Sequence, residues 1–133
     1  MSSLSANVEI VAAFYGADDA QRFALLDPDV EWIQNEGFPG GGHYHSADDV
    51  RQGVFGEIRR QWSTWETELD ELLDAGDTVV AIGAYRATAK TTGTSVRAAF
   101  AHVFTIAGGR VVRLRQFTDT ALLVRALTLP DLI

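Results

Sequence analysis

The chain has 133 residues, of which 47% are hydrophobic and 22% charged, a size and composition typical of one globular domain with its own core. Its formal net charge of −7 argues against nucleic acid or an anionic membrane as a partner, because both attract clustered Lys and Arg side chains. Cysteine is absent, which excludes disulfides, thiolate nucleophiles and thiolate metal ligands. We predict a single domain over residues 1–133. With no basic, apolar leader and no long apolar run, we expect it in the cytoplasm and away from membranes.

Helical spacing of apolar residues is the main signal in the first half of the chain. It predicts a helix over 7–15, for which Ser5 or Asn7 is available as N-cap. Clustered Gly and Pro residues favour an irregular, mobile loop over 35–46, after which Ser46 can cap another helix. In chain order, the predicted elements are helices over 7–15 and 20–26, a strand over 30–33, the loop over 35–46 and a helix over 47–62.

β-branched residues and Gly turns dominate the second half. Gly93 and the Gly108-Gly109 pair mark turns between strands, and Asp119 stands where a final helix over 121–127 needs an N-cap. Segment 65–73 has a mixed pattern of apolar and charged residues. The clearest strands are 78–88, 96–106 and 110–117. Counting one further strand to which no range is assigned, the order of two helices, a strand, a loop, a helix and four strands predicts an α+β layer fold with helices on one face of an antiparallel sheet.

His102 is the leading candidate for a functional residue. Strand alternation places it on the same face as Phe100 and Phe104, where burial would lower the pKa of its imidazole and leave a neutral ring able to donate or accept. The alternative is a core histidine bonded to a backbone carbonyl. Gln116 faces the same side from the next strand, either to bind a ligand or to orient His102. Tyr85 ends a strand of small residues, and its phenol, with an ordinary pKa of about 10, suits hydrogen bonding in a cavity.

Asp119 and the His43–His45 pair are two further groups of polar residues, and each has a simpler role than catalysis or metal binding. Asp119 is interpreted as a helix cap rather than a catalytic acid. His43 and His45 could share one metal if the loop is extended, but we favour a role for this loop as a lid over a cavity and expect no metal site.

Short motifs along the second half carry a family resemblance. They are Gly76-Asp77-Thr78-Val79-Val80, Gly83-Ala84-Tyr85-Arg86, Thr92-Gly93-Thr94-Ser95-Val96, Phe100-Ala101-His102-Val103-Phe104, Gly109-Arg110-Val111-Val112 and Phe117-Thr118-Asp119-Thr120. Together with the order of elements over about residues 8–127, they resemble the SnoaL-like branch of the nuclear transport factor 2-like (NTF2-like) superfamily. The resemblance implies a cone-shaped, strongly bent sheet with three helices packed on its concave face, a ligand cavity inside, no cofactor and a homodimer.

The superfamily includes ketosteroid isomerases, and this sequence differs from them at their catalytic positions. Gln34 matches the position of the catalytic base, Ile10 that of the helix tyrosine and His102 that of the acid in the oxyanion hole. Because an amide cannot accept a substrate proton as a base, steroid isomerisation of the usual kind is not expected.

Polyketide cyclases and limonene epoxide hydrolases give the same kind of partial match. His102 fits the cyclase histidine, but the partner acid falls at Gln116. The Asp-Arg-Asp set of the epoxide hydrolases matches Tyr85, Gly83 and Gln116, so that set is absent.

These comparisons lead to a prediction with two alternatives. We expect a largely apolar cavity, free of ionised carboxylates, that binds a small hydrophobic or amphipathic molecule. Either the chain catalyses proton transfer next to a carbonyl, as an isomerase, cyclase or dehydratase, or it is a non-catalytic ligand-binding or dimerisation module. The predicted catalytic residues are His102, Gln116 and Tyr85. The predicted ligand-binding residues are Trp32, Tyr15, Trp62, Phe104, Leu114, Thr118, Gln34 and His43.

Overall fold

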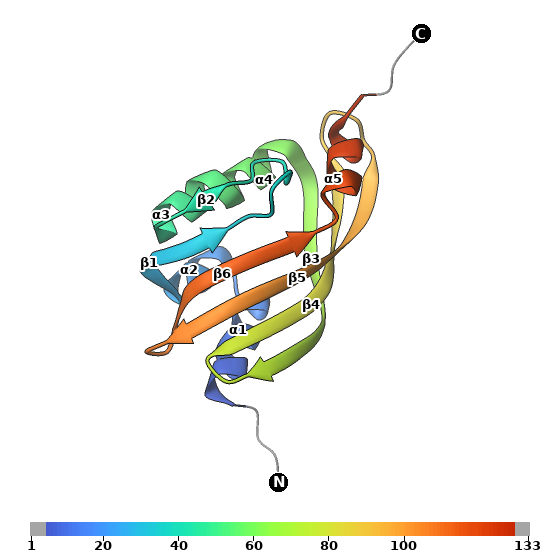
Figure 1. Ribbon diagram of the computed structural model, residues 1–133. Coiled ribbons are helices and arrows are strands. Elements are labelled where there is room, and N and C mark those ends of the chain that lie inside the picture. The colour runs from blue at the N-terminus through green and yellow to red at the C-terminus, as the bar shows by residue number, and fades with distance from the viewer. Residues whose placement is uncertain (1–4, 130–133) are drawn as a thin grey trace.

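The computed structural model describes residues 5–129 as one curved sheet with helices against it (Figure 1). The strands are β1 (Leu26–Ile33), β2 (His43–Tyr44), β3 (Trp62–Ala75), β4 (Thr78–Ala89), β5 (Ser95–Ala107) and β6 (Arg110–Thr118). The helices are α1 (Ala6–Gly16), α2 (Asp19–Ala24), α3 (Ala47–Val50), the π-helical turn η1 (Arg51–Phe55), α4 (Gly56–Gln61) and α5 (Thr120–Leu127). None of the helices described is long and apolar enough to cross a bilayer.

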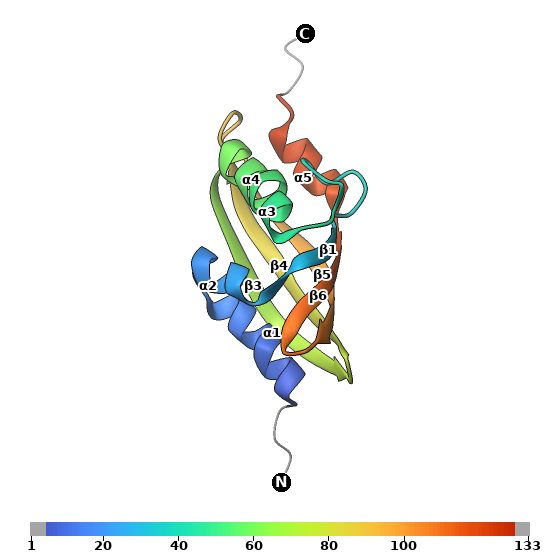
Figure 2. The same ribbon diagram turned by 90° about the vertical axis from the view of Figure 1, so that its left-hand side faces the viewer.

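The sheet has the strand order β2-β1-β6-β5-β4-β3, and all neighbours are antiparallel except β1 and β6, which are parallel. The α+β class is confirmed, while the expectation of a wholly antiparallel sheet is wrong at this pair. α1 packs on β3 and β4, the α3–η1–α4 segment contacts β1 and β3, and α5 contacts β5 (Figure 2). The helices thus cover the inner face of the sheet and one of its ends.

Helix starts follow the caps visible in the sequence. The Ser5 hydroxyl accepts the Val8 N–H at the start of α1, and Asp119 accepts the Leu122 N–H at the start of α5. The predicted cap role of Asp119 is confirmed. α2 begins with a capping box in which the Asp18 side chain and the Gln21 side chain each bond the other's backbone N–H.

Three segments differ from the sequence prediction. In the predicted loop over 35–46, His43–Tyr44 form strand β2, which pairs with β1. The third helix is interrupted by η1 and ends at Gln61, and the mixed segment 65–73 lies inside the long strand β3. β3 is an edge strand that pairs only with β4 along its length, and most of its side chains are exposed. The β3–β4 register shifts between Trp62 and Thr64 and between Leu69 and Glu71, which interrupts the alternation that identifies a half-buried strand.

η1 coincides with a close contact between Gly53 and the ring of Tyr44. A Cβ at Gly53 would lie 2.3 Å from Tyr44 Cε1, and the Tyr44 hydroxyl donates to the carbonyl of Gly40 at 2.9 Å, which holds the ring in place. We predict that Gly53→Ala lowers the free energy of unfolding by about 1–3 kcal/mol, measured by urea titration. Gly56→Ala is the matched control, because its Cβ would meet only the Arg51 carbonyl at 3.6 Å, and it should gain up to about 1 kcal/mol. Equal effects of the two substitutions would contradict this contact.

Candidate functional site

A cavity of about 350 Å³ lies between the inner face of the sheet and α1, α2, η1 and α4. Its apolar lining is formed by Phe14, Trp32, Val54, Phe55, Ile58 and Trp65, and its polar lining by Tyr15, Gln34, Thr67, Tyr85, His102 and Gln116. Three charged side chains complete it, namely Asp19, Arg22 and Arg59. His102, Gln116 and Tyr85 are buried, whereas the Asp19 and Arg59 side chains are 50% and 59% exposed. The charged residues therefore mark the mouth of the cavity and His102 marks its inner end.

His102 is held on both sides by tyrosines. It lies on β5 between Phe100 and Phe104, and its ring stacks on Phe100 with centroids 4.0 Å apart. Its Nδ1 atom is hydrogen-bonded to the Tyr15 hydroxyl from α1, and its Nε2 atom lies 2.5 Å from the Tyr85 hydroxyl from β4. Both ring nitrogens are thus occupied by side chains of the protein, and a ligand in the cavity meets phenol groups rather than the imidazole.

Gln116 extends this chain of hydrogen bonds, and its own two bonds have a defined direction. It pairs directly with His102 across β5 and β6, and its Nε2 atom lies 2.8 Å from the Tyr85 hydroxyl. The backbone N–H of Asn35, which can only donate, lies 3.1 Å from Gln116 Oε1. The Gln116 oxygen therefore accepts from Asn35 and its amide group donates to Tyr85.

The protons of this network can be counted. Tyr15, neutral His102 and Tyr85 carry one polar hydrogen each, and only two hydrogen bonds join them. If the Tyr85 hydroxyl donates to His102 Nε2, then the Nδ1–H of His102 donates to the Tyr15 oxygen. The Tyr15 O–H then has no acceptor within the network. In the other tautomer the Tyr15 hydroxyl donates to Nδ1 and the Nε2–H donates to the Tyr85 oxygen, so the Tyr85 O–H has no acceptor within the network. Since Tyr85 already accepts from Gln116, either arrangement leaves one phenol O–H free to donate to a ligand.

Burial keeps every member of the network uncharged. It lowers the pKa of His102 to about 3, so the ring is neutral at physiological pH. It also raises the pKa of Tyr15 and Tyr85 well above the ordinary value, with Tyr85 adding to the effect on Tyr15. Neither an imidazolium nor a phenolate is thus available in the resting site.

Gln34 provides a second donor to the cavity. It is buried at the end of β1, and the indole N–H of Trp32 donates to its Oε1 atom at 2.8 Å. Because an indole N–H can only donate, the amide NH2 of Gln34 is identified unambiguously. Within residues 5–129 this NH2 group has no hydrogen-bond partner, and Gln34 lines the cavity. The inner site is therefore richer in donors than in acceptors.

Loss of the two tyrosine hydroxyls should have unequal effects on stability. Tyr85→Phe leaves both Gln116 Nε2 and one nitrogen of His102 without a partner, whereas Tyr15→Phe affects only one nitrogen of His102. We expect the free energy of unfolding to fall by about 2–3 kcal/mol for Tyr85→Phe and about 1 kcal/mol for Tyr15→Phe. Urea titrations of the two variants measure this, and equal losses would show that Tyr85 is not the centre of the network.

The predicted site residues divide into two groups. Those that line the cavity are Tyr15, Trp32, Gln34, Tyr85, His102 and Gln116. Trp62, Phe104 and Leu114 are buried in the core instead, and Thr118 bonds the carbonyl of Ala99. His43 is half-exposed and pairs with Glu31 at 2.8 Å, away from the cavity lining. Among residues 5–129, no group of three or more His, Asp or Glu side chains is placed to hold a metal ion.

Several residues of the cavity were not predicted. Trp65 and Thr67 were missed because segment 65–73 was not identified as a strand. The helix tyrosine that meets His102 is Tyr15, while Ile10 packs against the core. The expectation of a cavity free of carboxylates is wrong at its mouth, where Asp19 lies.

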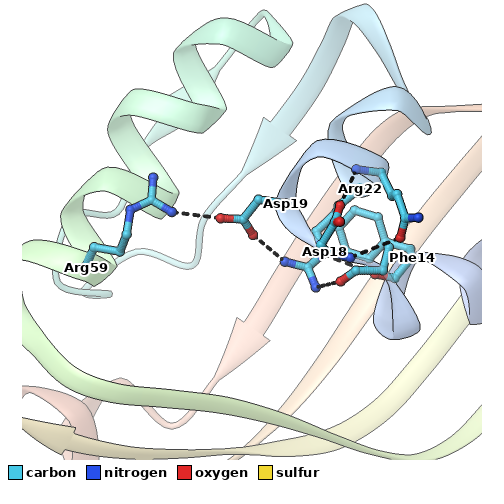
Figure 3. Close-up of polar contacts among 7 residues, drawn as sticks. Phe14, Asp18, Asp19, Arg22 and Arg59 are labelled. Carbon is cyan, nitrogen blue, oxygen red and sulfur yellow. Dashed lines mark hydrogen bonds and ion pairs between the residues drawn. The ribbon is translucent and has the colours of Figure 1, made fainter.

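Asp19 is engaged by two arginines at this mouth. It pairs with Arg22 at 3.0 Å and with Arg59 at 2.8 Å, so its oxygens face guanidinium groups (Figure 3). The inner end of the cavity, around His102, remains neutral.

Comparison with known proteins identifies the family to which this fold and cavity belong. A family model described as a SnoaL-like domain matches residues 8–114. The chain belongs to the SnoaL-like domain family of NTF2-like proteins.

Solved structures agree with this family. An NTF2-like protein from Burkholderia thailandensis is 38% identical, with a TM-score of 0.89 over 95% of this chain and 100% of that chain. An NTF2-like protein of unknown function from Burkholderia pseudomallei is 28% identical, with a TM-score of 0.85 over 95% of this chain and 100% of that chain. A Catenulispora acidiphila protein with a ketosteroid isomerase-like fold, solved in complex with trimethylamine, is 14% identical and has a TM-score of 0.76 over 97% of this chain and 96% of that chain, which shows a shared fold alone. No match was found among curated proteins.

Proposed function

We propose that the protein binds a small aromatic or amphipathic carbonyl compound in this cavity and transfers a proton next to the carbonyl group. The observation that carries the proposal is that both ring nitrogens of His102 bond tyrosine hydroxyls, which by proton count leaves one phenol O–H of Tyr15 or Tyr85 free. Together with the Gln34 amide, it supplies donors to an acceptor oxygen at the inner end of an aromatic cavity. A carbonyl oxygen is such an acceptor, and the cavity volume of about 350 Å³ suits a ligand of one or two rings.

The network can move a proton without creating charge. In the tautomer with a free Tyr15 O–H, that proton passes to the ligand oxygen while the His102 Nδ1 proton moves to Tyr15. At the same time, Tyr85 gives its proton to His102 Nε2 and takes the proton from the carbon next to the carbonyl. The ketone becomes an enol, one C–H bond is replaced by one O–H bond, and the network ends in its other tautomer. Because burial disfavours phenolate and imidazolium, these transfers are concerted.

A test substrate for this reaction is 2-acetonaphthone, an aryl methyl ketone. Calorimetry measures its binding, and proton NMR in D2O measures exchange of its methyl protons. We expect wild-type protein to accelerate this exchange and Tyr15→Phe to return it to the buffer rate. Tyr44→Phe is the matched control, because Tyr44 bonds the Gly40 carbonyl outside the cavity and its loss should leave exchange unchanged.

A non-catalytic ligand-binding module is the second candidate. It is favoured by the lack of a free carboxylate base in the cavity lining, because the Asp19 carboxylate is paired with Arg22 and Arg59. Binding of 2-acetonaphthone without proton exchange would support this candidate over the reaction. Absence of binding would contradict both.

A further inference from the structure

Arg22 is fixed at the mouth of the cavity by contacts on every side. Its Nε and Nη2 atoms donate to the carbonyls of Phe14 and Ala17 at 3.1 and 3.0 Å, and Nη1 donates to Asp19 at 3.0 Å (Figure 3). The guanidinium carbon also lies 5.3 Å from the ring centroid of Phe14 and 5.8 Å from that of Phe55. Arg22 therefore holds the α1–α2 corner and is not free to follow a ligand.

Arg59, in contrast to Arg22, is exposed and weakly held. Within residues 5–129, its one side-chain hydrogen bond runs from Nη1 to Asp19 Oδ2 at 2.8 Å, across the space between α4 and α2 (Figure 3). The side chain is 59% exposed, and an exposed ion pair of this kind contributes little to stability. When Arg59 leaves, the Asp19 carboxylate still has Arg22 as a partner. Moving the Arg59 side chain from Asp19 to another anion therefore costs little free energy.

The charge at the mouth is opposite in sign to that of the whole protein. Arg22 and Arg59 against Asp19 give a formal +1 among the residues that line the cavity, while the chain carries −7. A positive mouth on an acidic protein attracts anions locally, and a guanidinium binds a carboxylate through two parallel N–H bonds.

We propose that Arg59 selects ligands that carry an anionic group, in particular aromatic carboxylates, by exchanging Asp19 for the ligand at the cavity mouth. This inference rests on the proposed function, since the aromatic part and the inner oxygen of the ligand occupy the site described above. The ligand class that results is an aromatic acid, with its carboxylate at Arg59, its ring against the aromatic lining and an acceptor oxygen toward Gln34 and the free phenol O–H. Arg59 is a specificity-determining residue in this arrangement and takes no part in proton transfer.

The test compares 2-naphthoate with 2-naphthamide, which has the same shape and no charge. Dissociation constants from calorimetry at low salt should favour naphthoate by at least about fivefold in the wild-type protein. Arg59→Gln should abolish this preference while leaving the affinity for naphthamide unchanged. Arg60→Gln is the control, because Arg60 is the next residue of α4, is 67% exposed and pairs with Glu57 outside the cavity lining. This control should keep the preference.

The outcomes separate this inference from the proposed function. Equal affinity of the wild-type protein for the two compounds, or a preference that survives in Arg59→Gln, would overturn the role of Arg59 and leave the proposed binding site standing. Failure of both compounds to bind would overturn the role of Arg59 together with the aromatic binding site. A preference that declines in 0.5 M NaCl would support the ionic contact, because exposed charges are strongly screened at that salt.

Discussion

Acidification below pH 6.5 should destabilise the protein steeply because of His102. Burial lowers the pKa of this imidazole in the folded state to about 3, from an ordinary value of 6.5. Between pH 3 and 6.5, the imidazole of His102 is protonated in the unfolded chain and neutral in the folded protein. The free energy of unfolding is therefore not reduced by His102 above about pH 6.5, and it falls as the pH is lowered toward 3. The loss is about 1.4 kcal/mol for each pH unit, or about 3 kcal/mol between pH 6.5 and 4.

Urea titrations at several pH values measure this loss. Carboxylates also titrate in acid, so the wild-type protein is compared with His102→Gln, which retains hydrogen-bonding capacity but has no proton to gain in this range. We expect the stability of the wild-type protein to fall by about 3 kcal/mol more than that of the variant between pH 6.5 and 4. Parallel pH profiles of the two proteins would show that His102 is not held neutral by burial.

Gly83→Ala should be the most damaging small substitution in the sheet. A Cβ at Gly83 would lie 2.0 Å from the backbone oxygen of Glu68 and 2.7 Å from Phe100 Cζ. A β-bulge interrupts the β3–β4 register between Leu69 and Glu71, which is where the backbone of β3 approaches Gly83. Because a backbone atom cannot turn aside as a flexible side chain does, we expect a loss of at least about 3 kcal/mol in the free energy of unfolding.

The control for this substitution is Gly109→Ala. Gly109 has a φ of +77° and open space around its Cβ position, so this change costs about 1–2 kcal/mol through backbone conformation alone. Gly83 has no such positive φ, and its cost comes from the close contact. Thermal or urea unfolding of both variants gives the comparison. A smaller loss for Gly83→Ala than for Gly109→Ala would contradict the close approach of the β3 backbone to Gly83.

The parts of the fold and site that could be predicted are those encoded locally. Side-chain alternation along β5 placed His102 between Phe100 and Phe104, and the structure buries all three on the inner face. The turn at Gly108-Gly109 is confirmed by positive φ at both residues and brings Gln116 opposite His102. Local patterns were sufficient here because alternation and tight turns depend on residues close in sequence.

The rest depends on contacts between distant segments. Tyr15 reaches His102 across 87 positions of sequence, and Arg59 reaches Asp19 across 40, so no spacing rule links them. Edge strand β3 carried no alternation to identify it, and with it the position of Trp65 in the cavity was missed. The helical position of Tyr15 was predicted, but its role as the partner of His102 was not.

Nitrogen NMR of His102 at pH 5 is the most direct test of the tyrosine–histidine network. We predict one protonated and one unprotonated ring nitrogen, with a strongly deshielded ring N–H signal that changes in both Tyr15→Phe and Tyr85→Phe. Two protonated ring nitrogens at that pH, or a ring N–H signal unaffected by both substitutions, would contradict the neutral network on which the proposed function depends.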